Sequence, residues 1–420
     1  MDIDACDQAI WGSGDMNTRK KIEPANIDAL LRIMVDDEAS DLFITEGTPP
    51  SLKINGSLKP LSDWSLSSDQ VRALVFSIMT PEQIDAFEEE LEANFALQQS
   101  EVGRFRVNVF QQQTEIGMVI RRINTNIPSV EELQLPAQLK DLAMGQRGLI
   151  LVVGATSSGK SSTLAAMIGH RNQYSQGHIV SVEDPIEFLH RHRGCIVTQR
   201  EVGIDTHSYA AALKNTLRQA PDVIMIGEIR SRETMEHAIA FAETGHLVVS
   251  TLHATNASQA LDRVINFFPD ERRSQLLMDL SLHLKAVVAQ RLIPSAHGER
   301  RRVAVEVMLN SPLVSDLILR GETHLLRDVM KKSGQQGMKT FDQALFKLYK
   351  KGDISHDDAI MYADSPNEIR LMIKLGGKLD PTELTSAMQG VTYDSSDVNG
   401  NDESVMLHHS SRTRTRPTRK

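Results

Sequence analysis

The 420-residue sequence contains only two cysteines, Cys6 and Cys195, and no Cys-x-x-Cys pair. A disulfide framework and a four-thiolate zinc site are therefore excluded, and Cys195 is expected to be a small buried apolar residue. No apolar run reaches the roughly 18 residues that a membrane-spanning helix needs, and the N-terminus lacks the apolar core of a signal peptide. We expect a cytoplasmic protein without a transmembrane segment.

Aromatic residues make up only 5% of the chain, and the formal net charge is −9. A broad nucleic-acid surface needs stacking rings and positive potential, so no nucleic-acid partner is expected, although a local basic groove is not excluded. The hydrophobic content of 40% and the charged content of 24% are those of a globular protein. The length suggests two or three domains.

One stretch matches the pattern of a phosphate-binding loop, and it consists of Gly154, Ala155, Thr156, Ser157, Ser158, Gly159, Lys160 and Ser161, with Ser162 next. An apolar run, Leu149 to Val153, precedes the loop, and a helical pattern, Ser162 to Ile168, follows it. The motif requires this strand–loop–helix context, whereas an ordinary Gly/Ser-rich turn does not. The loop predicts ATP binding, with Lys160 on the β- and γ-phosphates and the Ser161 hydroxyl on Mg²⁺.

Around the loop, short apolar runs alternate with amphipathic segments such as Ser208–Gln219 and Arg232–Thr244. The runs are apolar on both faces, which is typical of buried parallel strands. We expect strands at Leu149–Val153, His178–Val182, Val223–Ile226 and Leu247–Thr251. The fold class is α/β, with a RecA-like doubly wound sheet over residues 146–310.

The remaining chain divides by composition and period. Residues 26–125 contain short alternating runs, an Asn55-Gly56 hairpin signal and helical patterns, which indicate a small α+β domain. Residues 126–145 form the expected linker. A helical subdomain is predicted over residues 311–376, from patterns at Leu313–Leu319, Thr340–Lys350, Ser355–Tyr362 and Ser365–Lys374. Residues 1–25 and 377–420 are expected to be a disordered extension and tail, with Met16 as a hypothetical natural start.

Ligands bind at the carboxyl ends of the strands in a parallel doubly wound sheet. Glu183, Glu228 and His253 each follow a different predicted strand, so they should lie at the edge that carries Lys160. Asp222 precedes its strand and should lie at the opposite edge, and His246, at the start of its strand, is harder to justify. Glu228 is a candidate for orienting Mg²⁺ or the attacking water, and Glu183 for the base or water-positioning group. The alternative for each carboxylate is a helix cap, and for His253 a buried histidine bonded to backbone.

No arginine in the predicted sheet domain is obviously placed to offset transition-state charge. Arg104, Arg106 and Arg121 lie on predicted strands of the first domain. In an oligomer, one of them can reach a neighbour's nucleotide as an arginine finger. An exposed strand arginine without such a role is the open alternative.

Four ordered motifs resemble those of the hexameric type II/IV secretion ATPases. They are residues 154–161 (Walker A), 179–187 (Asp box), 222–230 (Walker B) and 243–253 (His box), and residues 39–43 and 104–108 resemble the family's PAS-like N-terminal domain. The match runs from about Ile27 to Leu375. The resemblance implies Glu183 as catalytic base, Glu228 at Mg²⁺ or water, His253 and His246 near the γ-phosphate, and Arg104 and Arg121 as interface arginines.

Within the family, pilus-extension and secretion members usually carry a four-cysteine zinc module that this sequence lacks, which favours the pilus-retraction branch. Residues 220–235, 263–269 and 365–375 are similar to the accessory retraction ATPase rather than to the main motor. The main motor's Ala-Ile-Arg-rich helix is replaced by Leu313–Arg320, and Ser157 stands where the family usually has glycine.

The resemblance implies a homohexamer at the cytoplasmic face of the inner membrane. It would hydrolyse ATP to promote type IV pilus retraction and twitching motility, together with a partner retraction ATPase and the inner-membrane platform protein. Two alternatives stay open: a nucleotide-binding adaptor of the retraction motor with little turnover, and a DNA-translocating RecA-like ATPase.

Overall fold

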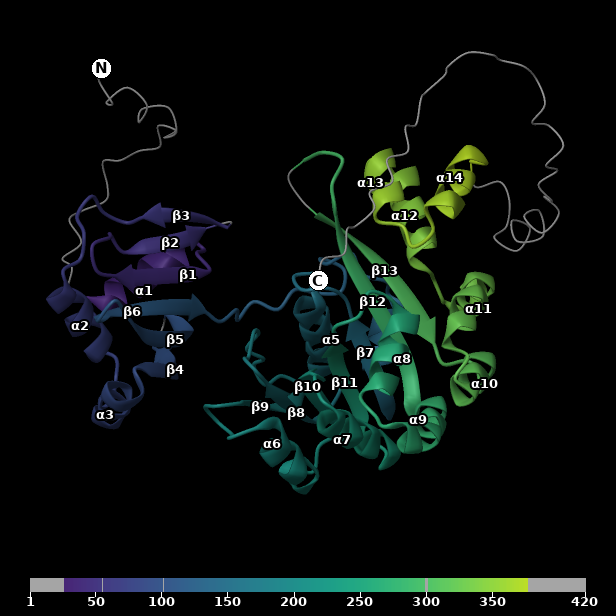
Figure 1. The fold of residues 1–420 in the computed structure, drawn as a ribbon, viewed down its shortest axis with the longest axis horizontal. Coiled ribbons are helices and arrows are strands. Elements are labelled where there is room, and N and C mark those ends of the chain that lie inside the picture. Colours follow the sequence, from purple (N-terminus) through teal and green to yellow (C-terminus); the bar gives the residue numbers. More distant parts are fainter. Residues whose placement is uncertain (1–25, 55, 101, 299–300, 377–420) are drawn as a thin grey trace, which may run out of the picture.

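The computed structural model describes residues 26–54, 56–100, 102–298 and 301–376. The predicted disordered extension, the predicted tail and the hypothetical start at Met16 lie outside these residues. Figure 1 shows a smaller N-terminal part joined by a linker to a larger sheet domain, with a group of short helices beyond it. Within the described part of the chain, every helix is too short or too polar to cross a membrane.

The N-terminal part is an antiparallel sheet in the order β3-β2-β1-β6-β5-β4, with three helices packed on it. Alternate residues of β5, such as Phe105, Val107 and Val109, are buried, as expected for a sheet with one covered face. Gly56 has a φ of 85° between β2 and β3, at the predicted hairpin turn. The elements are α1 (Ile27–Asp36), β1 (Asp41–Thr45), β2 (Ser51–Ile54), β3 (Ser57–Pro60), α2 (Ser68–Phe76), α3 (Pro81–Glu90), β4 (Glu92–Gln99), β5 (Gly103–Gln112) and β6 (Glu115–Arg122).

The larger domain contains a seven-stranded sheet in the order β13-β12-β7-β11-β10-β8-β9, in which only the β12–β13 pair is antiparallel. The four predicted strands are confirmed as β7 (Gly148–Val153), β8 (Gly177–Glu183), β10 (Val223–Glu228) and β11 (Leu247–Leu252). The α/β fold class with a doubly wound sheet is therefore confirmed. The remaining strands are β9 (Cys195–Glu201), β12 (Leu284–Pro294) and β13 (Arg301–Leu309).

Helices cover both faces of this sheet, which explains why its strands are apolar throughout. In β7, Leu149, Leu151 and Val153 pack on one side, whereas Ile150 and Val152 pack on the other, against α5. The linker region contributes a short helix, α4, that packs on α5. The helices are α4 (Gln138–Ala143), α5 (Lys160–Tyr174), α6 (Tyr209–Thr216), α7 (Arg232–Glu243), α8 (Ala257–Asn266) and α9 (Asp270–His283).

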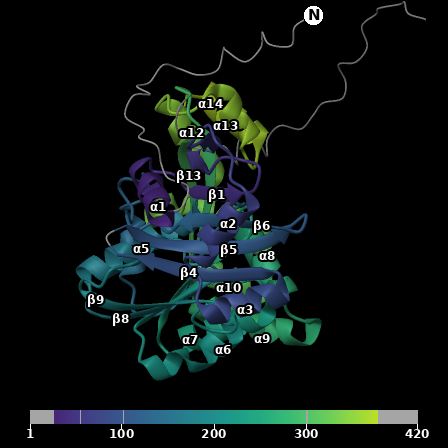
Figure 2. The same ribbon diagram turned by 90° about the vertical axis from the view of Figure 1, so that its left-hand side faces the viewer.

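The C-terminal helices are α10 (Pro312–Arg320), α11 (Leu326–Lys332), α12 (Phe341–Lys350), α13 (His356–Met361) and α14 (Pro366–Lys374). Four of them coincide with the predicted helical segments, and α11 was not predicted. Figures 1 and 2 both place α12, α13 and α14 at the end of the molecule opposite α6 and α7. A capping box between Thr340 and Gln343 starts α12.

A buried carboxylate holds these helices together. The Asp342 side chain is fully buried, pairs with Arg327, and accepts backbone hydrogen bonds from Asp364 (2.9 Å) and Ser365 (3.2 Å). It therefore ties α12 to α11 and to the start of α14.

Replacing Asp342 by alanine is expected to destabilise the helical subdomain by about 2–4 kcal/mol, because two backbone donors and one guanidinium lose a buried partner. Thermal unfolding of the full chain measures the change. Asp357→Ala is the matched control, since the Asp357 side chain is 99% exposed. Equal effects of the two substitutions would contradict the assigned role of Asp342.

Candidate active site

The phosphate loop connects the buried strand β7 to α5 by a tight turn. A Cβ at Gly154 would lie 2.7 Å from the Gln290 carbonyl oxygen, so a side chain does not fit there. Gly159 has a φ of 88° at the N-cap position of α5. Ser157 has a φ of 61°, a left-handed conformation that costs a non-glycine residue about 1–2 kcal/mol. The loop therefore holds one strained residue where glycine would be unstrained.

The start of α5 is open to an anion. Gly159, at the N-cap position, has no side chain that could accept a hydrogen bond from the first N–H groups of α5. These N–H groups are therefore not capped by Gly159 and can bind an anion in the loop. The Lys160 ammonium donates hydrogen bonds to the carbonyl oxygens of Gly154 (3.0 Å) and Ala155 (2.8 Å). Burial lowers the pKa of Lys160, and the carboxylates of Glu228 and Glu187 oppose this effect. The lysine is thus held across the loop.

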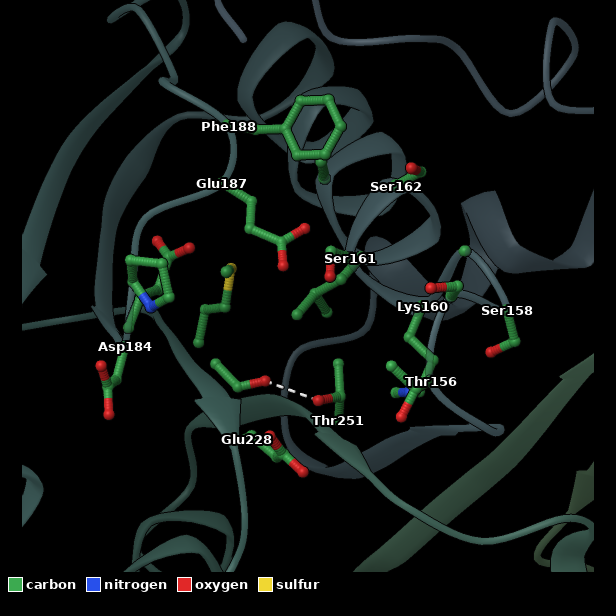
Figure 3. Close-up of a pocket in the computed structure, with 18 of the residues that line it drawn as sticks. Thr156, Ser158, Lys160, Ser161, Ser162, Asp184, Glu187, Phe188, Glu228 and Thr251 are labelled. Atoms are coloured by element: carbon green, nitrogen blue, oxygen red, sulfur yellow. Dashed lines mark hydrogen bonds between the residues drawn. The ribbon is translucent and has the colours of Figure 1, made fainter. Parts of the chain in front are cut away.

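The predicted edge of the sheet forms a cleft of about 610 Å³. Residues 156–162 of the loop line one wall, and Glu183, Glu228 and His253 line the other. Glu183 and Glu228 end the neighbouring strands β8 and β10, and His253 follows β11, so the sheet order brings the three together. Figure 3 shows Lys160, Ser161 and Glu228 around this space.

Glu183 is buried at the floor of the cleft. Its Oε1 accepts hydrogen bonds from Ser181 Oγ (2.7 Å) and Gln199 Nε2 (3.1 Å). Burial raises the pKa of Glu183 to about 7, although both hydrogen bonds act in the opposite direction. A carboxyl group with a pKa near neutrality is suited to accept a proton from water.

Glu228 is held by two basic side chains. Arg230 Nε donates to its Oε2 at 2.7 Å, and His253 Nε2 lies 2.9 Å from its Oε1. His253 therefore contacts the carboxylate directly in this structure. Thr251 Oγ1 donates to the Gly227 carbonyl at 2.7 Å and fixes the backbone beside Glu228 (Figure 3).

Two candidates lie away from the cleft. His246 precedes β11, and its ring nitrogen Nδ1 lies near Thr244 Oγ1 (3.1 Å) and the Phe241 carbonyl (3.2 Å), at the amino end of the strand. Asp222 also lies at that end and accepts a hydrogen bond from the His178 N–H at 2.7 Å. Both residues lie at the amino ends of their strands, whereas Lys160 lies at the carboxyl ends. For Asp222, this is the position that the sequence predicted.

The three arginines of the N-terminal part lie in different places. Arg121 lines the nucleotide cleft of its own chain, and its Nε pairs with Asp41 Oδ1 at 2.7 Å. Arg106 Nη1 lies 3.9 Å from Glu201, a buried carboxylate on β9. Burial raises the pKa of Glu201, and Arg106 and Arg104 partly offset the rise. Arg104 is therefore near the sheet domain, but it is not among the residues that line the cleft.

Two polar residues at the site, Glu187 and Gln199, were not predicted from the sequence. Figure 3 shows the Glu187 carboxylate pointing into the cleft toward Ser161. Its signal was available, because Glu187 lies four residues after Glu183 in the loop that follows β8. Gln199 lies on β9, a strand that was not predicted. Its amide donates to Glu183 and to the Phe188 carbonyl (2.9 Å), and accepts from the His190 N–H (2.7 Å).

Gln199→Ala is expected to lower kcat by about tenfold or more with little change in KM, because a hydrogen bond to a charged group contributes about 1.5–3 kcal/mol. Loss of this donor also moves the acid limb of the pH profile to higher pH, since the carboxylate form of Glu183 is less stabilised. Steady-state phosphate release measures both effects. Thr198→Val is the control, because Thr198 bonds His178 on the other face of β9. A rise in KM without a change in kcat would contradict this role.

One protein-family match covers most of the chain. The family described as "Type II/IV secretion system protein" matches residues 17–341. The chain belongs to the type II/IV secretion system protein family. Residues from all four segments that resemble the family's motifs, 154–161, 179–187, 222–230 and 243–253, line the cleft.

Members of the type II/IV secretion family resemble the chain along most of its length. The type IV pilus ATPase PilU of Pseudomonas aeruginosa is 58% identical over 370 residues, which cover 88% of this chain and 97% of PilU. The PilT retraction ATPase of the same species is 40% identical over 341 residues, covering 81% and 99%. A crystal structure of the pilus retraction motor PilT with bound ADP has a TM-score of 0.77 and 37% identity, covering 83% and 99%. With its phosphate loop, this member of the secretion family is an ATPase.

The type II/IV secretion ATPases imply a magnesium ion beside the nucleotide. The Ser161 hydroxyl and the Glu228 carboxylate both line the cleft, and hydroxyl and carboxylate oxygens are hard ligands that Mg²⁺ accepts. Glu228 Oε1 is buried and lies 2.9 Å from His253 Nε2 without hydrogen-bond geometry, so a cation can take this oxygen if the imidazole moves aside. The residues present therefore fit a nucleotide-bound Mg²⁺ that takes its other ligands from phosphate and water.

Proposed function

We propose that this chain is a homohexameric ATP-hydrolysing motor that promotes type IV pilus retraction at the cytoplasmic face of the inner membrane. It would act with a partner retraction ATPase and the inner-membrane platform protein. The observation that carries the proposal is the cleft in which Glu183, Glu228 and His253 face the phosphate loop. The similarity to PilU and PilT supports the link to type IV pili, and the similarity to a twitching motility protein of Neisseria gonorrhoeae supports the link to twitching.

In the proposed mechanism, the open N-terminus of α5 and Lys160 bind the β- and γ-phosphates. Lys160 would exchange its bonds to the Gly154 and Ala155 carbonyls for phosphate oxygens. Ser161 and Glu228 would hold Mg²⁺, which when bound neutralises phosphate charge. His253 would then keep Glu228 oriented, or turn to the γ-phosphate.

Glu183 would act as the general base. Ser181 and Gln199 fix its carboxylate, and the carboxylate takes a proton from the water that attacks the γ-phosphorus. The bond between the γ-phosphorus and the bridging oxygen breaks, and ADP and phosphate leave. Arg121, which comes from the N-terminal part, would offset the charge that develops on the phosphoryl oxygens. Hydrolysis would thereby depend on the position of the N-terminal part.

The proposal is tested with the purified full-length chain and in cells. We expect Mg-ATP-dependent phosphate release by wild type, its loss in Lys160→Ala, and hexamers by native mass spectrometry. Cells that lack the chain should recover twitching with wild type and not with Lys160→Ala. If a variant that binds ATP without hydrolysing it restores twitching fully, the chain is a nucleotide-binding adaptor and not a motor. Hydrolysis that nucleic acid stimulates would favour a DNA translocase.

A further inference from the structure

A second cavity of about 610 Å³ lies between the linker region, β13 and α12, and it shares no lining residue with the nucleotide cleft. Lys339, Lys347 and Lys351 line it, and among the described residues no carboxylate does. We call it the lysine cavity. Two of the elements that line it, β13 and α12, are labelled in Figure 1 and pack against each other. Its size falls in the range of about 300–1,000 Å³ that is typical of small-ligand sites.

The three ammonium groups lack counterions in the part of the chain that the structure describes. None of them forms an ion pair or a side-chain hydrogen bond there, whereas Lys331 in α11 pairs with Glu368 at 2.8 Å. Burial lowers the pKa of Lys339 to about 8, and the charges of Lys347 and Lys351 lower it further. Repulsion among the three ammonium groups in the lysine cavity lowers the stability of the fold. A bound anion would remove this repulsion.

Backbone donors add to this positive potential. Val307 exchanges two backbone hydrogen bonds with Lys339, at 2.8 and 3.0 Å, on the outer edge of β13. Alternate residues of an antiparallel strand direct their N–H groups to the same side, so Val303 and Val305 also direct theirs to this edge. Both residues line the lysine cavity. Backbone N–H groups beside ammonium groups match the oxygens of phosphate.

We propose that the lysine cavity binds a phosphate-bearing anion with at least two phosphate groups. Each phosphate carries about −1.5 to −2 charge near pH 7, so two of them balance three lysines. A compact anion fits better than an extended acidic peptide that pairs with β13, because Lys347 and Lys351 come from α12 and its C-terminal end and not from the edge of β13. The bound anion would connect the linker at Gln138 to α12.

The test uses inorganic pyrophosphate and the full-length chain with Lys160→Ala, which weakens competing binding at the phosphate loop. Calorimetric titration at constant ionic strength should show one binding event. The double change Lys347→Gln, Lys351→Gln should weaken it by about tenfold or more, because charge-assisted bonds are lost. Lys350→Gln is the matched control on α12, since Lys350 does not line the cavity. It should change the affinity by less than about twofold.

Protein stability gives a second readout that does not depend on the heat of binding. Without pyrophosphate, Lys347→Gln should not lower the melting temperature, because it removes repulsion. With pyrophosphate, the chain with all three lysines should gain more melting temperature than the chain with the double change at the same pyrophosphate concentration. Lys347 and Lys351 are exposed, so these variants are expected to fold.

Vesicles of phosphatidylcholine, with and without cardiolipin, distinguish a lipid headgroup from a soluble anion. Lysine-dependent binding to cardiolipin vesicles alone would support the same chemistry with a lipid as its source. The proposal is overturned if neither probe binds, if Lys350→Gln weakens binding as much as the double change, or if only a polyglutamate peptide binds. These outcomes do not depend on whether the chain retracts pili.

Discussion

Replacing Glu183 by glutamine is expected to lower kcat for ATP hydrolysis by about a hundredfold to ten-thousandfold, the usual contribution of a positioned general base. Glutamine keeps the shape of the side chain and can still accept the Ser181 hydrogen bond, but it cannot take a proton from water. Nucleotide affinity should change little, because Lys160 and the start of α5 remain. Phosphate release at saturating Mg-ATP and titration with a fluorescent nucleotide measure the two quantities separately.

The same substitution should change the pH dependence. The pKa of Glu183 in the free protein is raised to about 7 by burial, and only the carboxylate form accepts a proton. For wild type, kcat/KM should therefore rise with pH up to about 7 and level off above it, with a fall of about tenfold per pH unit well below. The residual activity of Glu183→Gln should lack this limb, which separates Glu183 from the titration of the nucleotide itself.

Glu236→Gln provides the control, since Glu236 forms a surface pair with Arg232 at 2.8 Å. It should retain wild-type kcat and the same acid limb. An unchanged kcat in Glu183→Gln would exclude Glu183 as the base and leave Glu187, whose carboxylate also points into the cleft, as the candidate.

The placement of the main site could be predicted from the sequence because strand polarity is a strong constraint. Each of Glu183, Glu228 and His253 follows an apolar run, and parallel strands end at one edge, so the three had to lie together. The same polarity places His246 at the opposite edge, although the family resemblance put it near the γ-phosphate. For His246, the position in the strand was the better guide to its place in the fold.

Gln199 could not be predicted in the same way. It lies in β9. At the start of this strand, Cys195 and Val197 are buried and Ile196 is exposed, and the polar residues Thr198 and Gln199 follow. This edge strand lacks the uniformly apolar pattern of β7 and β11, so no pattern marked it as a neighbour of β8. Contacts such as Gln199 to Glu183 depend on pairing between segments, which periodicity does not report.

Arg121 also shows what a sequence leaves open. Its residue type suggested an arginine finger, but whether it reaches its own cleft or a neighbour's depends on how the linker directs the N-terminal part. The structure places Arg121 at the cleft of its own chain, held by the buried Asp41. Its side chain is 66% exposed, so a small shift would free it to meet phosphate oxygens.

Arg121→Ala is expected to lower kcat by about a thousandfold or more, the scale of a lost arginine finger, with little loss of nucleotide affinity. Arg122→Ala is the matched control, because Arg122 is the next residue on β6 and its Nη1 donates to the Val35 carbonyl within the N-terminal part. Single-turnover phosphate release separates the chemical step from product release. If both variants lose activity equally, the effect is one of folding of the N-terminal part and not of the site.

Mixed oligomers decide which cleft Arg121 serves. Arg121→Ala and Glu183→Gln chains are assembled together in equal amounts. If Arg121 acts within its own chain, every site lacks one group and the mixture stays inactive. If it acts on a neighbour, about a quarter of the sites in a random cyclic assembly combine an intact Glu183 with an intact arginine, and activity returns to that extent. The contact of Arg121 with its own cleft predicts the first outcome. Recovery of activity to about a quarter would show that, in the assembled ring, Arg121 of one chain acts in the cleft of the neighbouring chain.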